Sequence, residues 1–245
     1  MTPPAWLGYG WLEPHFIGWM LQGAALTAWL ALLVCGLATL LGVLLAAGYE
    51  QRWRSVRLAV RTFLSLHRNT PLMVQLLLWY FGVAGLLPEA VMLWLNAPHE
   101  VTLAGWTLAW PSFEFVAALI ALSLYSAAFV AEEIRAGIRS VAPGQHAAAL
   151  ALGMTPRQVF RHIVLPQALR VVCRPLLGQY LGVIKNTSLT MAIGVAELSY
   201  SSRQVESETL LTFQAFAVAT LLYLLLVLGA QLAGGRARPT LGGGR

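Results

Sequence analysis

Apolar runs separated by short polar segments make up most of this chain of 245 residues. From Phe16 to Tyr49 no side chain carries a full charge, which is longer than one bilayer crossing needs and shorter than two crossings require. We therefore predict one long, tilted helix there. Four further apolar runs follow, so the pattern predicts five membrane-spanning helices, over about residues 17–47, 71–95, 113–133, 175–197 and 209–233.

The overall composition agrees with this pattern. Hydrophobic residues make up 58% of the chain and charged residues 11%, whereas charged residues alone form about a quarter of an ordinary soluble domain. We therefore expect a single all-α transmembrane domain over residues 1–245, with no room for a large soluble catalytic domain. The acids are all Glu, which excludes metal or phosphoryl chemistry built on Asp. Cys35 and Cys173 lie far apart in sequence, and we expect both to remain thiols.

Basic residues are distributed unevenly among the connecting segments. Fourteen of the fifteen arginines fall after the first apolar run, between the third and fourth runs, or in the tail. They are Arg52, Arg54, Arg57, Arg61, Arg68, Arg135, Arg139, Arg157, Arg161, Arg170, Arg174, Arg236, Arg238 and Arg245. Because short loops rich in Lys and Arg stay in the cytoplasm, the amino end should lie outside and the carboxyl end inside. The net charge of +6 then reflects topology and does not indicate nucleic-acid binding.

The cytoplasmic segment 134–174 mixes polar residues with short apolar groups and is too long for a simple turn. Pro143 and Gly144 should end the helix that leaves the third apolar run. The run Gln145 to Leu152 is rich in Ala and Leu, which favours a short helix closed by Gly153.

A second short helix should follow in the same segment. Thr155 and Pro156 are typical of an N-cap and a first helical position, and Pro166 should interrupt the helix that they open. Its apolar face is formed by Val159, Phe160, Ile163 and Val164. We therefore predict a helix–turn–helix that lies against the cytoplasmic mouth of the membrane domain.

This segment resembles a known loop motif. Ala147-Ala148-Ala149, then three residues, Gly153, nine residues, and Ile163-Val164-Leu165-Pro166 match the spacing EAA, x3, G, x9, I-x-L-P of ABC-importer permeases. Ala147 stands where many members have Glu. The resemblance implies that the 143–166 loop is coupled to a cytoplasmic ATPase through Ala147, Ala148, Ala149, Gly153, Ile163, Leu165 and Pro166. Small side chains there would let the short helix enter a cleft of the ATPase.

Other segments resemble one branch of that family. Arg68 to Gln75 is similar to the R-(G/N)-T-P-L-x-V-Q entry to the second span of polar amino acid permeases. Lys185 to Leu198 resembles their K-(D/N)-T-S-L…IGV-x-EL element. Trp79-Tyr80-Phe81 and Leu86 to Glu89 look most like the glutamate/aspartate and general amino acid branch. The chain thus resembles the membrane permease subunit of a polar amino acid ABC importer, of the histidine/glutamine/glutamate type.

The resemblance implies a type I ABC importer permease fold and half of a translocation pathway for a polar amino acid, of the acidic, glutamate- or aspartate-like kind. It implies four partners: a cytoplasmic ABC ATPase dimer, a second, identical or homologous permease subunit, an extracytoplasmic amino acid binding protein, and the lipid bilayer. ATP and Mg would be bound by the ATPase, so this chain would carry no cofactor, metal or catalytic residue. The implied location is the bacterial inner membrane.

Charged residues within or at the ends of the apolar runs are candidates for function. Lys185 lies inside the fourth run, where an ionised side chain costs a few kcal/mol unless it is paired or hydrated. We predict that it lines the pathway and pairs with a substrate carboxylate or a pathway Glu; the alternative is that it reaches an interface or caps carbonyls between subunits.

Glu132 and Glu133 end the third run, and we predict that they offset Arg135, Arg139 or another loop charge.

Small polar residues accompany Lys185 and the start of the second run. They are Asn186, Thr187 and Ser188 on one side, and Asn69, Thr70 and Gln75 on the other. Such side chains at membrane depth either join helices by hydrogen bonds or contact a substrate, and both interpretations stay open.

Two other functional classes agree less well with the sequence. A secondary transporter or channel subunit without an ATPase partner is the alternative, although the chain shows no inverted repeat and no series of intramembrane carboxylates suited to ion coupling. A membrane enzyme would need a catalytic motif, and G-x-S-x-G and H-E-x-x-H are both absent. The nucleotide-binding motif G-x-x-x-x-G-K-[ST] is absent as well.

Overall fold

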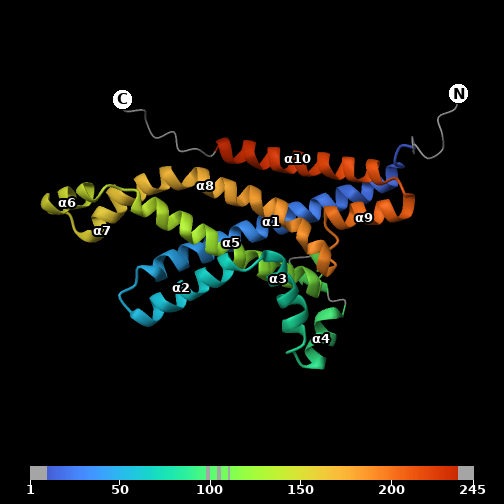
Figure 1. Cartoon of the computed structure of the whole chain (residues 1–245), viewed down its shortest axis with the longest axis horizontal. Helices are drawn as coiled ribbons and strands as arrows, with labels where there is room; N and C mark the ends of the chain where they lie inside the picture. Colours follow the sequence, from blue (N-terminus) through green and yellow to red (C-terminus); the bar gives the residue numbers. More distant parts are fainter. Residues whose placement is uncertain (1–9, 98–99, 104–105, 110, 237–245) are drawn as a thin grey trace. The chain divides into compact units, whose positions relative to one another are not determined.

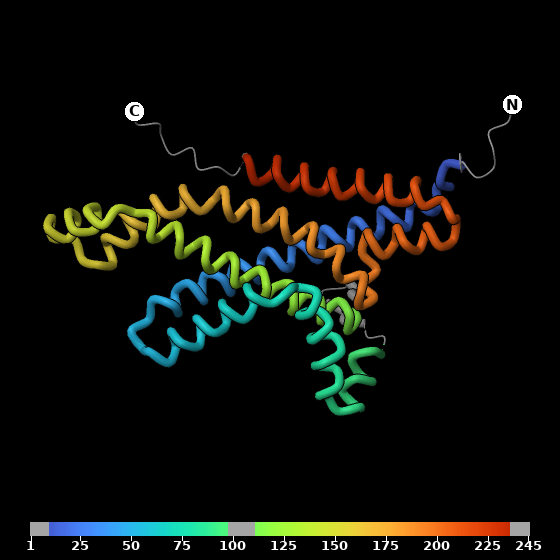
Figure 2. Tube along the Cα trace, in the orientation of Figure 1, coloured from blue at the N-terminus to red at the C-terminus, as the bar shows by residue number. Residues whose placement is uncertain are grey.

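The computed structural model describes residues 10–97, 100–103, 106–109 and 111–236 (Figures 1 and 2). In chain order the elements are α1 Pro14–Tyr49, α2 Arg54–Asn69, α3 Leu72–Leu77, η2 Leu78–Gly82, α4 Glu89–Asn96, β1 Glu100–Leu103, β2 Trp106–Ala109, α5 Phe113–Arg139, α6 Pro143–Ala151, α7 Pro156–Val159, η3 Phe160–Val164, α8 Leu165–Asn186, η4 Thr187–Ile193, α9 Leu198–Thr209 and α10 Thr212–Arg236. Here η2 and η3 are π-helical turns, and η4 is a 3₁₀ helix.

Helices form nearly all of the described chain, which confirms the predicted helical architecture. The exception is the short antiparallel pair β1 and β2, in which Glu100 lies opposite Ala109 and Leu103 lies opposite Trp106. The apolar pattern did not predict this hairpin, because strands of only 4 residues are too short to show a clear alternation.

The chain forms two compact units. Unit 1 contains Met1–Leu33, Pro71–Leu122 and Ile184–Val227, and unit 2 contains Val34–Thr70, Ser123–Val183 and Leu228–Arg245. The divisions fall within α1, α5, α8 and α10, so each of these long helices contributes residues to both units.

In unit 1, the amino-terminal part of α1 packs with α9 and with the beginning of α10. The buried side chains of this core are Leu12, Met20, Ala24, Leu198, Val205, Ala215 and Ala219. A β-carbon added to Gly23 would lie 2.4 Å from the Ser201 hydroxyl oxygen. Glycine is therefore needed at that position for α9 to approach α1 so closely.

In unit 2, the carboxyl-terminal part of α1 packs against α5 and α8. Ala38, Ala127 and Val130 are buried there, and Leu176 and Tyr180 of α8 pack against them. The helix α2 is held to the same region through a second small core of Leu64, Ala128 and Ala131. These contacts hold α2 and its arginines near the carboxyl-terminal end of α5, where several of the candidate residues lie.

Three described helices have the length and apolar composition needed to cross a membrane: α1, α5 and Thr212–Gly235 of α10. The predicted region 71–95 is divided, because the helix formed by α3 and η2 ends in a turn at Gly85 and α4 begins only after Pro88. The predicted region 175–197 is also divided. There α8 has already begun at Leu165, and η4 ends at Ile193, directly before Gly194, whose φ of 89° favours glycine.

The helix–turn–helix predicted within residues 134–174 is confirmed, with α6 as its first helix. Gly153 follows α6 with a φ of 83°, a left-handed conformation in which glycine closes many helices. Thr155 then caps α7 in a capping box: its side-chain oxygen accepts from the backbone N–H of Gln158 at 3.4 Å, and Gln158 Oε1 accepts from the backbone N–H of Thr155 at 2.8 Å.

The prediction that Pro166 interrupts the second helix is wrong. The chain stays helical from α7 through η3 into α8, and Pro166 lies in the first turn of α8. The proline is accommodated by the π-helical turn η3, which lies just before it. Such a turn widens the helix locally and so tolerates a residue without a backbone N–H.

Candidate functional site

The segment from α6 to η3, Pro143–Val164, contains a small core of its own. Ala149, Val159 and Val164 are buried together, and Ile138, Val141, Met154 and Ile163 pack around them. The side chain of Ala149 must therefore be small because it packs within this core of the chain's own residues. Leu165 and Pro166, the next residues, are half-buried at the start of α8.

The opposite surface of this segment is exposed and partly apolar. Ala147 and Ala148 are exposed, and Leu152, between α6 and Gly153, is 84% exposed. Leu150 and Phe160 are exposed as well. Large apolar side chains displayed on a short, capped and internally packed segment are typical of a surface that another protein covers. Sequence reasoning missed Leu152, whose place directly before the left-handed Gly153 is the one signal that could have identified it.

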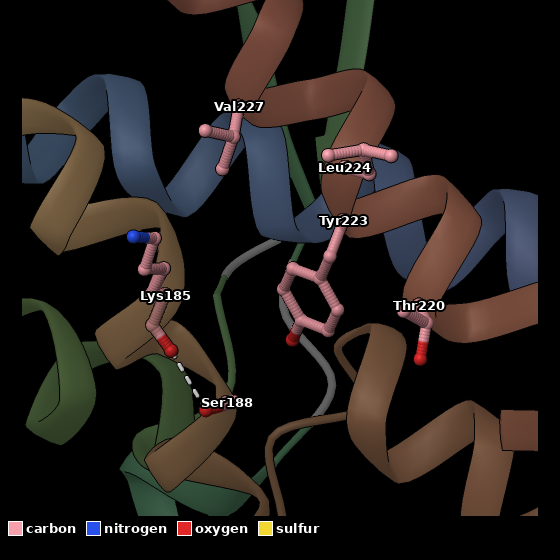
Figure 3. Close-up of a pocket in the computed structure, with 6 residues that line it drawn as sticks. All are labelled: Lys185, Ser188, Thr220, Tyr223, Leu224 and Val227. Atoms are coloured by element: carbon pink, nitrogen blue, oxygen red, sulfur yellow. Dashed lines mark hydrogen bonds between the residues drawn. The ribbon is translucent and has the colours of Figure 1, made fainter. Parts of the chain in front are cut away.

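Lys185, at the end of α8, lines a pocket of about 440 Å³ in unit 1. Figure 3 shows Lys185 and Ser188 on one wall of this pocket and α10 on the other. The α10 wall is formed by Thr220, Tyr223, Leu224 and Val227. The Lys185 side chain is exposed and makes no ion pair with any carboxylate in the described ranges. Lys185 is therefore a charged residue on the wall of an open, mostly apolar pocket.

The polar residues after Lys185 mainly satisfy the end of α8. The Thr187 hydroxyl donates to the Ile184 carbonyl at 2.7 Å, and the Ser188 hydroxyl donates to the Lys185 carbonyl at 2.7 Å. Thr187 is fully buried, whereas Asn186 and Ser188 are half-buried. These bonds replace the α-helical hydrogen bonds that the carbonyl groups lose where α8 changes into η4. Ser188 is the member of this group that also borders the pocket.

The residues predicted at the start of the second apolar run are separated between the two units. Asn69 and Thr70 belong to unit 2 and bond within α2, where Asn69 Nδ2 donates to Ser65 Oγ at 3.1 Å and Thr70 Oγ1 donates to the Leu66 carbonyl at 2.7 Å. Gln75 lies in unit 1 and is buried in α3, which packs against η4. The structure thus places α3, which carries Gln75, against η4, the element that follows Lys185.

Glu197 forms a closed hydrogen-bond network that the sequence did not reveal. Its side chain is fully buried. The carboxylate accepts from the Tyr223 hydroxyl at 2.5 Å, from the Tyr200 backbone N–H at 3.0 Å, and from the Thr27 hydroxyl at 3.4 Å. Thr27 Oγ1 in turn accepts from the Leu198 backbone N–H at 3.1 Å. Glu197 thereby caps α9 and joins it to α1 and α10.

The prediction for Glu132 is confirmed. Its carboxylate lies 2.7 Å from Arg135 Nη1, 3.0 Å from Arg139 Nη2 and 3.5 Å from Arg68 Nη1. Glu133 differs, because its Oε1 accepts a hydrogen bond from Gln179 Nε2 at 3.2 Å and so joins α5 to α8. Within the described ranges, no group of three or more His, Cys, Asp or Glu side chains is placed to hold a metal ion.

A protein-family comparison covers most of the chain. Residues 38–238 match the family described as "Binding-protein-dependent transport system inner membrane component". The matched region includes α2 to α10 and therefore contains both the α6–η3 segment and the Lys185 pocket.

Individual relatives agree with that match. The chain is 29% identical over 212 residues to the glutamate/aspartate import permease protein GltJ of Escherichia coli K12, covering 86% of this chain and 82% of GltJ. It is 37% identical over 161 residues to the "Probable glutamine ABC transporter permease protein GlnM" of Bacillus subtilis 168, covering 66% and 64%. A crystal structure of an amino acid ABC transporter with histidines superposes with a TM-score of 0.77 at 27% identity, over 93% of this chain and 96% of that one.

Proposed function

The chain belongs to the family of binding-protein-dependent transport system inner membrane components, and from this premise we propose that it is one permease half of an ATP-driven amino acid importer. Two such subunits, identical or homologous, would form the pathway. A binding protein would deliver the amino acid from outside, and a cytoplasmic ATPase dimer would bind and hydrolyse ATP with Mg. The chain itself then contributes the membrane passage and the link to the ATPase.

The single observation that carries this proposal is the exposed surface of the α6–η3 segment. Its fold is fixed from within by the Ala149 core and the Thr155 capping box, so the outer side chains are free to bind another protein. Leu152, 84% exposed at the end of α6, is the apolar residue best placed to enter a cleft of the ATPase. We therefore assign it as a docking residue beside Ala147, Ala148 and Gly153.

A pair of glutamate substitutions tests the docking surface. Leu152→Glu places a charge where an apolar contact is proposed, and should abolish both copurification with the ATPase and ATP-dependent uptake. Ala147→Glu adds the same charge on α6 at the position where the family motif commonly has Glu, and should retain both. Equal copurification and equal uptake in the two variants would contradict a docking role for Leu152. Gly153→Arg and Ala149→Arg are less selective, because they would also strain the left-handed turn or the internal core.

We also propose five membrane spans, with the amino end outside and the carboxyl end in the cytoplasm. The arginine distribution supports this orientation, because short loops rich in Arg remain on the cytoplasmic side. Single cysteines introduced after removal of Cys35 and Cys173 test it. A cysteine at Ala97 should react with an impermeant maleimide from outside, and one at Arg157 only from the cytoplasmic side. Labelling of Ala97→Cys from the cytoplasmic side alone would contradict the arrangement.

Lys185 is proposed to line the pathway and to attract the carboxylate of an acidic amino acid. Two observations support this: Lys185 lines an open pocket and makes no ion pair with a described carboxylate, and the chain is similar to GltJ over most of both lengths. The relatives also include proteins named for glutamine or solved with histidines, so the substrate needs a direct test. In vesicles that contain the assembled importer, excess unlabelled glutamate or aspartate should suppress uptake more strongly than histidine or arginine.

The alternative of a secondary transporter or channel predicts uptake that does not require the ATPase. Vesicles prepared with the chain alone, and with the chain plus its ATPase and binding protein, distinguish these classes. Uptake should occur only in the complete system and only with ATP inside the compartment that holds the ATPase. Uptake by the chain alone, driven by an ion gradient, would overturn the importer proposal.

A further inference from the structure

Unit 2 contains a second pocket, of about 360 Å³, that is lined by four arginines and one carboxylate. The arginines are Arg61 and Arg68 of α2 and Arg135 and Arg139 of α5, and the carboxylate is Glu132. Tyr49, Leu64, Ser65 and Asn69 complete its lining. Nothing in the transport proposal uses this pocket.

The carboxylates near the pocket do not balance its positive charge. Glu132 lies within ion-pair distance of Arg68, Arg135 and Arg139 at once. Glu50 adds only a contact of 4.0 Å to Arg135 Nε. Arg61 makes no ion pair with a described carboxylate, and its guanidinium lies 4.9 Å from the centre of the Tyr49 ring. Even with both carboxylates counted, the four arginines leave a net charge of +2 at the pocket.

Arg135 shows that the pocket is a built feature of the fold. Its side chain is 6% exposed, and its guanidinium carbon lies 3.2 Å from the centre of the Tyr49 ring. The Nη1 atom is bonded to Glu132, but the buried Nε has no hydrogen-bond partner. Buried donors are rarely left unsatisfied, and an orphaned one at a pocket indicates an absent ligand or water. A buried positive charge that is only partly neutralised is also costly, and a further anion would reduce that cost.

We propose that this pocket binds a phosphate group, carried by an anionic phospholipid headgroup or present as a free anion. Several guanidinium groups from two helices suit a phosphate, whose tetrahedral oxygens accept hydrogen bonds from more than one direction. A headgroup is a ready source, because α2 is an amphipathic helix with Leu58 and Leu66 exposed and the exposed Trp53 directly before it, as in helices that lie at a membrane surface. Basic pockets of this kind on the cytoplasmic side of membrane proteins bind anionic headgroups.

Arg61→Gln is the selective variant, because Arg61 lines the pocket and has no ion pair to lose. Arg54→Gln is its control, since Arg54 is exposed on the same helix, carries the same charge and lies outside the pocket. The permease complex, purified in a nonionic detergent, is heated in the presence of dioctanoyl phosphatidylglycerol, dioctanoyl phosphatidylcholine or inorganic phosphate at matched ionic strength. The melting temperature is followed as each additive is titrated, and neither a substrate nor ATP is required.

Phosphatidylglycerol should raise the melting temperature of the wild-type and Arg54→Gln complexes, whereas phosphatidylcholine should not. The apparent affinity should fall roughly tenfold or more in Arg61→Gln, as expected when a charge-assisted hydrogen bond is lost. A shift with phosphatidylglycerol but not with phosphate assigns the site to lipid. An equal, Arg61-dependent shift with phosphate assigns it to a free anion. Shifts that are the same in wild type and Arg61→Gln, or no shift with either phosphatidylglycerol or phosphate, would overturn the proposal.

Discussion

Lys185 and Glu197 are two charged residues of unit 1 whose surroundings differ in almost every respect. Glu197 is fully buried, and three donors from α1, α9 and α10 satisfy its carboxylate. Lys185 is exposed, lines an open pocket and has no ion pair to a described carboxylate. A buried charge with a complete set of hydrogen bonds holds elements together, whereas an open charge is available to a ligand or to another subunit. The difference predicts that substitutions at the two sites fail in different ways.

The largest effect on stability is expected for Glu197→Ala. The substitution removes the α9 cap, worth about 1 kcal/mol, and leaves the Tyr223 and Thr27 hydroxyls and the Tyr200 N–H without their acceptor, which costs about 1–3 kcal/mol. The yield of folded complex should fall sharply, as measured by size-exclusion chromatography and thermal unfolding. Glu208→Gln, an exposed change on the same helix, should leave the yield unchanged. A stable Glu197→Ala complex would show that the network is not structural.

Lys185→Met should instead spare the protein and reduce transport. Methionine keeps much of the apolar stem, and loss of a charge-assisted contact of about 1.5–3 kcal/mol corresponds to roughly tenfold or more in rate. Uptake per assembled complex is the decisive measurement, with Lys185→Arg expected between wild type and Lys185→Met because guanidinium differs from ammonium in shape. Loss of complex rather than of uptake would favour a subunit contact, and normal uptake would exclude both roles.

The contrast between these two residues also explains what the sequence could and could not predict. Lys185 stood out because a single ionised residue interrupts an apolar run, and a local pattern is enough to reveal that. Glu197 did not stand out, because its donors Thr27 and Tyr223 lie 170 and 26 residues away along the chain. Such a network depends on tertiary packing. The same holds for the Arg61 to Arg139 pocket, which requires α2 to lie beside α5.

The segment 134–174 is the opposite case, because its structure is local. Pro143, Gly153 and the Thr155–Gln158 pair act over a few residues, so the helix–turn–helix could be predicted from spacing alone. The continuity of the helix through Pro166 could not, since the π-helical turn that accommodates it leaves no composition signal. Long apolar runs likewise predicted α1 and α10, but not the division of the regions 71–95 and 175–197.

A moderate effect is expected for Thr27→Val, which preserves shape and removes both hydrogen bonds of the hydroxyl group. The Leu198 N–H would then lose its acceptor in a buried position, at a cost of about 1–2 kcal/mol. Glu197 would keep its two shorter bonds. The melting temperature should fall by less than in Glu197→Ala, while Thr27→Ser should restore it. If Thr27→Val were as damaging as Glu197→Ala, the bond from Thr27 would be the main support of the network.

The smallest effect on uptake is expected for Tyr223→Phe, at a residue that belongs to both environments. Tyr223 lines the Lys185 pocket, and its hydroxyl donates to Glu197 and lies 2.9 Å from Ser199 Oγ. Its removal leaves Glu197 with the bonds from Tyr200 and Thr27, so the loss of this charge-assisted bond should cost about 1.5–3 kcal/mol, or roughly 3–12 °C in melting temperature. Uptake per assembled complex should stay within about twofold of wild type, because phenylalanine keeps the packing of the aromatic ring at this position of α10. A large loss of uptake without a change in melting temperature would instead place the Tyr223 hydroxyl beside Lys185 in the pathway.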